Sequence, residues 1–171
     1  MKVTLLVRVP PTRAFEVFTE ETNAWWGVGP KYRFGDGERG ILQFEPGPNG
    51  RLFEQFSDGR TWEVGKVLAW EPGRRLHFEW RISNYAPGEC TEVEVWFEPT
   101  ESGTQVTLEH RGWKTLRPDH PARHGLDDNA YGGALALWWS DLLRSLDRWA
   151  TTSHHPTSSC EAALVQPTQP S

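Results

Sequence analysis

NAYGGALALWWSDLLRSLDRWA, residues 129–150, carries apolar side chains at intervals of three or four positions. This spacing brings them to one face of an α-helix. The expected apolar face comprises Tyr131, Leu135, Trp138, Leu142, Leu146 and Trp149, and the opposite side carries Asp141, Arg144, Asp147 and Arg148. The stretch therefore predicts a long amphipathic helix, which needs a large apolar surface to pack against.

Two tryptophans stand side by side in this stretch, and the chain has a second such doublet at Trp25 and Trp26. Adjacent residues do not share a face of a regular helix, so one ring of each pair should point inward while the other covers an edge or the surface. Trp138 fits the apolar face and Trp139 does not. Because exposed aromatic side chains favour interfaces, Trp139 would suit a contact between two copies of the chain, and a homodimer is one expectation.

The surface for the helix comes from the segments that precede it. Many of them alternate apolar and polar side chains, as strands with one buried face do, and turn sequences separate them. Strands are expected at 2–9, 32–34, 40–45, 51–56, 61–71, 74–82, 91–98 and 104–113. Two short helices should follow the first strand, at 10–21 and at 22–26, with Thr22 as a candidate N-cap of the second.

This order of elements predicts an α+β fold in which a curved antiparallel sheet of about six or seven strands wraps around the last helix. A bent sheet must cover its apolar face, and only that helix is long enough to do so. We expect the two to stand far enough apart to leave a space that aromatic side chains fill or line. Residues 1–150 should form one domain, and the polar, Pro/Ser-rich tail at 151–171 should be disordered.

Composition narrows the functional classes. The net charge of −5 and the absence of a Lys/Arg cluster argue against nucleic acid as a partner. No stretch resembles a signal peptide or approaches the roughly 20 apolar residues of a membrane span, so a cytoplasmic protein without membrane contact is expected. The ten tryptophans exceed what a close-packed core of this size usually needs, which indicates that some of them line a void.

Few polar side chains are expected inside. Strand alternation turns His110 inward, and it turns Glu54 inward with its neighbour Phe56. Each is either a structural group, for instance paired with the other, or a polar anchor or acid–base group in a cavity. His120 and His124 stand four residues apart, as metal ligands on a helix do, but the surrounding residues favour a solvated loop.

The glycines of GDGERG, residues 35–40, match the spacing of a dinucleotide-binding motif. Such a motif opens a helix, whereas here a strand-like segment follows, and Asp36 and Glu38 would repel phosphate. A hairpin turn is therefore the favoured interpretation. No metal or cofactor is expected.

Several local motifs resemble those of a known family. They are AFEVFTEETNAWW after the first strand, NGRLFEQF, WEVGKVLAWEPGRRLHFEW, GTQVTLEHRGW and a Tyr-Gly pair opening the last helix. The chain resembles the START and birch-allergen-like superfamily, often called SRPBCC, over residues 1–150, and within it the branch named after the activator of heat-shock protein 90 ATPase. The resemblance implies a helix-grip fold with an apolar cavity. Because the superfamily includes carriers, cyclases and co-chaperones, it specifies the fold better than the function.

The leading functional hypothesis is a binding protein for a small hydrophobic molecule, aromatic or lipid-like, held between sheet and helix. The expected cavity residues are Trp25, Trp26, Glu54, Phe56, Trp62, Phe78, Trp80, Val95, Phe97, His110, Tyr131 and Trp138. A cyclase or hydrolase that uses acid–base groups in the cavity is the first alternative, and a co-chaperone-like interaction protein is the second. Binding is favoured over catalysis because no nucleophile and base stand at a recognisable spacing.

Overall fold

The computed structural model describes residues 1–27, 34 and 40–153. Most of the strand expected at 32–34, most of the turn expected at 35–40 and nearly all of the expected tail lie outside the described residues. The helix that begins at Asp128 ends at Thr152, so it takes in the first two residues assigned to that tail.

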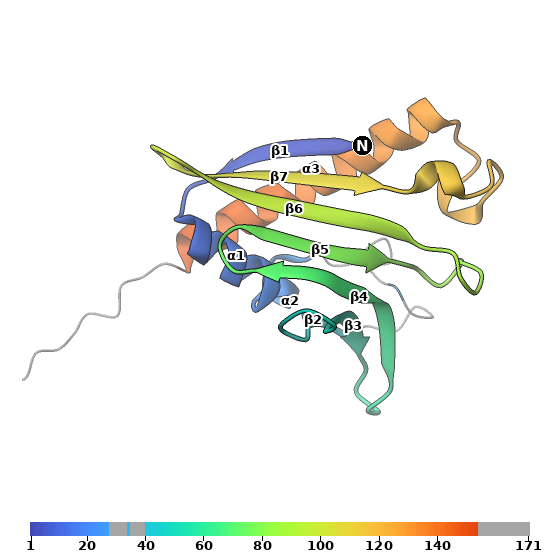
Figure 1. The fold of residues 1–171 in the computed structure, drawn as a ribbon, viewed down its shortest axis with the longest axis horizontal. Helices are drawn as coiled ribbons and strands as arrows, with labels where there is room; N and C mark the ends of the chain where they lie inside the picture. Colours follow the sequence, from blue (N-terminus) through green and yellow to red (C-terminus); the bar gives the residue numbers. More distant parts are fainter. Residues whose placement is uncertain (28–33, 35–39, 154–171) are drawn as a thin grey trace, which may run out of the picture.

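Seven antiparallel strands form one curled sheet in the order β1-β7-β6-β5-β4-β3-β2 (Figure 1). The strands are β1 (Lys2–Val7), β2 (Ile41–Phe44), β3 (Arg51–Gln55), β4 (Thr61–Glu71), β5 (Arg75–Trp80), β6 (Thr91–Thr100) and β7 (Gly103–Arg111). The α-helices are α1 (Pro11–Thr19), α2 (Thr22–Trp25) and α3 (Asp128–Thr152). In Figure 1, α3 runs behind β1, β7 and β6. The predicted α+β helix-grip architecture is therefore confirmed.

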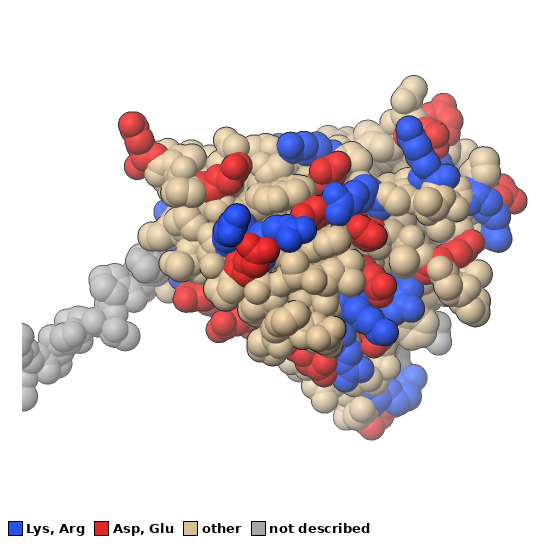
Figure 2. All heavy atoms as spheres, viewed as in Figure 1, with Lys and Arg blue, Asp and Glu red and all other residues tan. Residues whose placement is uncertain are grey.

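Strand register separates an apolar face from a charged one. Phe78 pairs with Val93, and Val95 pairs with both Leu76 and Leu108, so these buried side chains share the face that meets the helices. Successive residues of a strand point to opposite faces. The charged residues between them therefore lie on the outer face, where both signs are interspersed (Figure 2).

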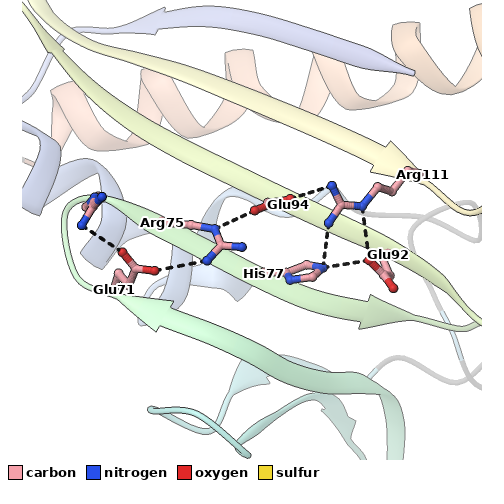
Figure 3. A network of polar contacts seen from close by, with 7 residues as sticks. Glu71, Arg75, His77, Glu92, Glu94 and Arg111 are labelled. Carbon is pink, nitrogen blue, oxygen red and sulfur yellow. Dashed lines mark hydrogen bonds and ion pairs between the residues drawn. The ribbon is translucent and has the colours of Figure 1, made fainter.

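A network of charged side chains crosses four strands on that outer face (Figure 3). Glu94 of β6 lies at its centre, 6% exposed, with its oxygens 2.6 Å from Arg75 Nε and 2.8 Å from Arg111 Nη1. Nearby, His77 Nε2 lies 3.0 Å from Glu92 Oε2. A buried carboxylate needs such partners, because an unpaired charge out of water is costly. These residues belong to the structure of the sheet and do not reach the interior.

The buried face of α3 differs from the predicted one. Trp139 is fully buried, Trp138 is half-buried and Trp149 is 38% exposed, so the expected inward and outward tryptophans are exchanged. Leu143 and Ala150, which lie on the same side of the helix as Trp139, also pack inward. The helix is therefore rotated about its axis relative to the orientation that the sequence predicted. An interface through Trp139 is therefore excluded. No helix in the described part of the chain has the length and apolar content to cross a bilayer.

Trp25 and Trp26 are both buried. The expectation that only one ring of each tryptophan pair points inward is therefore wrong for this pair as well. Helix α2 ends at Trp25, and Trp26 is extended with φ −65° and ψ 134°. The change of backbone direction lets both rings turn inward. Thr22 does not cap α2, because its hydroxyl donates to the carbonyl oxygens of Phe18 and Thr19.

Aromatic rings fill the middle of the space between sheet and helix. Trp26 directly after α2, Trp80 from β5 and Trp139 from α3 contact one another, with ring centroids 5.5–6.0 Å apart. Such edge and tilted contacts are favourable arrangements of large rings. The expected gap is thus closed at its centre, and hollows remain near the end at which α3 begins.

Candidate functional site

A pocket of about 390 Å³ lies where β5 and β7 end beside the first half of α3. Its wall is mainly aromatic, and two histidines face it. The lining residues are Phe34, Trp80, Ile82, His110, Trp113, Ala122, His124, Tyr131, Ala134, Leu135 and Trp138. Pockets of this size and lining are typical of sites for small apolar molecules.

A sharp turn after β7 positions Trp113 in this wall. Gly112 has φ 93°, a left-handed conformation that strongly favours glycine, and a Cβ there would lie 3.2 Å from Thr91 Cα. A short 3₁₀ helix, Trp113–Thr115, follows directly. The Trp113 ring then lies 4.8 Å from the His110 ring and 4.7 Å from the Tyr131 ring, measured between centroids. The turn therefore links β7 to α3 through three rings in tilted and edge-to-face contact.

Glu54 does not line the pocket but hydrogen-bonds the backbone of Phe34, which does. Its side chain is fully buried, and its two oxygens accept hydrogen bonds from the backbone amides of Phe34, at 3.2 Å, and Gly40, at 2.9 Å. Buried polar atoms need hydrogen-bond partners, and these amides supply them. Glu54 does not pair with His110, as one interpretation expected. It instead positions Phe34, whose ring lines the pocket.

His110 is fully buried, and both of its ring nitrogens have partners. Trp139 Nε1 donates to His110 Nδ1 over 3.2 Å, and His110 Nε2 lies 2.8 Å from Thr91 Oγ1. Because an indole nitrogen only donates, Nδ1 must be the acceptor and the proton must be on Nε2. Thr91 Oγ1 in turn donates to the Trp80 carbonyl oxygen over 3.2 Å. The network fixes the tautomer and orientation of the imidazole.

Burial lowers the pKa of His110 to about 3, and the positively charged amino terminus adds to the effect. A group with so low a pKa is a poor general base near neutral pH, since the best catalytic pKa lies close to the working pH. In addition, the lone pair on His110 Nδ1 already accepts the hydrogen bond from Trp139 Nε1. His110 therefore offers the pocket a neutral ring rather than a proton acceptor.

The expectation of a solvated loop at His120 and His124 is wrong for His120, which is buried, whereas His124 is exposed. His120 is 1% exposed, its Nε2 lies 2.9 Å from Glu89 Oε2, and its Nδ1 accepts from the Ala122 amide. The Nε2 contact ties the connection before α3 to the turn before β6, and the Nδ1 contact fixes the ring within that connection. In the ranges that the structure describes, no three His, Cys, Asp or Glu side chains gather as a metal site would require.

Four of the twelve predicted cavity residues lie on the pocket wall, namely Trp80, His110, Tyr131 and Trp138. Five others are core side chains that pack beneath it or further along the sheet: Trp25, Trp26, Phe78, Val95 and Phe97. Glu54 acts on the wall through Phe34. Phe56 is buried near β3 under the Arg60 guanidinium, and Trp62 lines a separate hollow beside Tyr85 and Arg81.

The prediction did not include Phe34, Ile82, Trp113, Ala122, His124, Ala134 or Leu135, which complete the pocket lining. Most of them lie in connections rather than in regular elements. For Trp113 a signal was present, because a glycine directly after an alternating strand commonly marks a change of direction.

Comparisons with known proteins agree with the helix-grip fold. The family model of Activator of Hsp90 ATPase homolog 1-like protein matches residues 8–132. A search among curated protein sequences finds no match.

The chain is also similar to solved structures. Protein MLL2253 from Mesorhizobium loti is 21% identical, with a TM-score of 0.62 over 91% of this chain and 98% of its own. The AHSA1 protein from Silicibacter pomeroyi is 19% identical, with a TM-score of 0.54 over 90% and 99%. An anthrahydroquino-γ-pyrone synthase is 35% identical over 64% of this chain and 74% of its own, but its TM-score of 0.47 is too low for its activity to bear on this chain.

Proposed function

The chain belongs to the family of activator of Hsp90 ATPase homolog 1-like proteins, and we propose that it binds a small, flat, largely apolar molecule in the pocket between β5, β7 and α3. The observation that carries this proposal is the wall itself. Trp80, Trp113 and Trp138 present indole rings to one hollow of about 390 Å³. Aromatic side chains supply large contact areas with little loss of side-chain freedom, so they suit a flat ligand.

The catalytic alternative has less support. His110 is neutral and engaged at both nitrogens, and Glu54 receives two backbone amides without lining the pocket. Acid–base catalysis needs a group that can exchange a proton with a bound molecule. Neither candidate is placed for that exchange, so binding is the function that the geometry favours.

The co-chaperone alternative needs an exposed surface for a protein partner. The large apolar side chains that are exposed in the described ranges come from β1, β2, β4, the connection before α3 and α3 itself. They are Leu6, Ile41, Leu68, Leu126, Leu137 and Trp149. Such single exposed residues are normal on protein surfaces. The pocket therefore supports binding of a small molecule better than these exposed residues support a co-chaperone role.

Filling the pocket tests the proposal. Leu135 is half-buried on the pocket side of α3, and Leu135→Trp adds an indole to the space that a ligand would occupy. We expect this variant to bind a neutral polycyclic probe, anthracene-2-carboxamide, at least about tenfold more weakly, a difference of about 1.4 kcal/mol. Quenching of tryptophan fluorescence during a titration, checked by native mass spectrometry, measures the affinity.

Leu137→Trp is the matched control, because it makes the same change on the same helix at a position that is 70% exposed and does not line the pocket. Its affinity should equal that of the unmodified protein. Equal affinities for all three proteins would place the probe elsewhere, and failure of every apolar probe to bind would remove the proposal.

A further inference from the structure

A second hollow of about 340 Å³ adjoins the proposed ligand pocket and shares His110, Trp113, Tyr131 and Leu135 with it. The two hollows differ in chemistry. The second adds the charged side chains of Lys114, Arg123 and Asp128, whereas Arg111, which also borders it, has its guanidinium paired with Glu92 and Glu94 on the outer face. It also includes the first turns of α3, whose amino-terminal end carries a partial positive charge. Two basic side chains, Lys114 and Arg123, and one carboxylate thus border a space next to an aromatic wall.

Arg123 is the buried member of this set, with 4% of its surface exposed. Its Nη1 is paired with Asp128 Oδ1, and its Nη2 donates to the Trp113 carbonyl oxygen over 2.7 Å. Its Nε is buried without a hydrogen-bond partner among the described residues. A buried guanidinium N–H without an acceptor costs free energy, and a ligand acceptor would recover it when the Arg123 side chain turns this solvent-shielded atom toward the hollow.

The neighbouring polar groups also offer hydrogen bonds. Trp113 Nε1 is buried without a described acceptor. Tyr131 also lines this hollow, and burial raises the pKa of its hydroxyl further above neutral pH, so the hydroxyl is a potential donor. Of the buried side-chain polar atoms without a described partner, the two that belong to residues lining this hollow, Arg123 Nε and Trp113 Nε1, are both N–H donors. The excess is one of donors, so the complementary ligand group is an acceptor.

We propose that the ligand carries a carboxylate or an equivalent oxyanion, which the second hollow holds beside Arg123, Trp113 and Tyr131 while its aromatic part occupies the first. The proposal rests on the proposed function and specifies its ligand class as aromatic acids. Arg123 is suited to the role, because its planar guanidinium matches carboxylate geometry and hydrogen bonds to charged groups are the stronger ones.

Asp128 competes with such a ligand for Arg123. Its side chain is 74% exposed, so the pair is open to solvent on the carboxylate side and can rearrange. Neutralising Asp128 should leave more of the Arg123 charge to the ligand. Asp127, which caps α3 by accepting from the Ala130 amide, is not involved, so Asp128→Asn should leave the start of the helix intact.

Two probes of nearly equal shape test the proposal on the full chain. We expect anthracene-2-carboxylate to bind at least about tenfold more tightly than anthracene-2-carboxamide near neutral pH. Arg123→Gln should abolish that preference, and Asp128→Asn should increase carboxylate affinity about threefold or more while leaving carboxamide affinity unchanged. Lys114→Gln, on the rim, should reduce the preference less than Arg123→Gln. Isothermal titration calorimetry at constant ionic strength gives all four comparisons.

Because Arg123 also ties the loop before α3, Arg123→Gln counts only if its circular dichroism spectrum matches that of the unmodified protein. If the spectrum of Arg123→Gln differs, the near-surface variants Asp128→Asn and Lys114→Gln test the carboxylate preference in its place. If both probes bind equally in the Leu135-lined pocket and Asp128→Asn changes neither affinity, the anionic ligand class is wrong while the proposed function stands. If neither probe binds, the proposed function itself fails.

Discussion

Replacing Trp139 with alanine should lower the free energy of unfolding by about 3–5 kcal/mol, the usual cost of deleting a large buried ring. Trp139 is fully buried, and its ring contacts those of Trp26, Trp80 and Trp138. The substitution also removes the hydrogen bond that its Nε1 donates to His110. A cavity and an unsatisfied nitrogen would thus appear together at the centre of the packing between α3 and the sheet.

Trp149→Ala is the matched control on the same helix. Its ring is 38% exposed, and its Nε1 donates to Glu21 Oε2 at the surface. Exposed interactions of this kind contribute about 1 kcal/mol or less. Urea unfolding followed by circular dichroism measures both losses. Equal losses in the two variants would mean that the buried face of α3 is not the one described above.

Acidification should destabilise the fold through His110. Burial lowers its pKa in the folded state to about 3, whereas an unfolded histidine titrates near 6.5. Between these values the unfolded chain binds the extra proton and the folded chain does not. The stabilisation is therefore fully present above about pH 6.5 and is lost as the pH falls toward 3. At about pH 4.5 the loss from this side chain is on the order of 3 kcal/mol.

Carboxylates with lowered pKa values, such as Glu89 and Glu92, also lose stabilising contacts in acid. A variant without the histidine separates the contributions. In His110→Gln, Gln does not titrate, so the free energy of unfolding should fall less steeply between about pH 6.5 and 4.5 than in the unmodified protein. Urea unfolding at a series of pH values gives the two slopes. Parallel slopes would show that the pKa of His110 is the same in the folded and unfolded states. His110 would then not be buried away from water.

The strands and their order of succession were predictable because alternation with period two is a strong and local signal. The rotation of α3 was not, since two overlapping faces of the stretch 129–150 are apolar enough to be buried. Trp138 and Trp149 support one face, while Trp139, Leu143 and Ala150 support the other. Only contact with the curled sheet selects between them, and the sequence pattern of the helix alone does not contain that contact.

The candidate site was less predictable than the fold, because much of its wall comes from connecting segments. Trp113 reaches the pocket through the left-handed turn at Gly112. The backbone amide of Phe34 donates to Glu54. Almost any residue could make this backbone hydrogen bond, so the residue type at position 34 does not reveal it. Strand parity did place His110 and Trp80 correctly on the inner face. It could not show that Trp139 and Thr91 engage both nitrogens of His110.

The most direct test of ligand binding in this pocket uses the indole N–H signals of a ¹⁵N-labelled sample. Each tryptophan gives its own signal, and single substitutions assign them. On titration with anthracene-2-carboxylate, the signals of Trp80, Trp113 and Trp138, which line the pocket, should shift together and saturate. Those of Trp62 and Trp149, which lie outside it, should stay in place. Shifts confined to Trp62 or Trp149, or no saturable shift at any indole, would contradict the account.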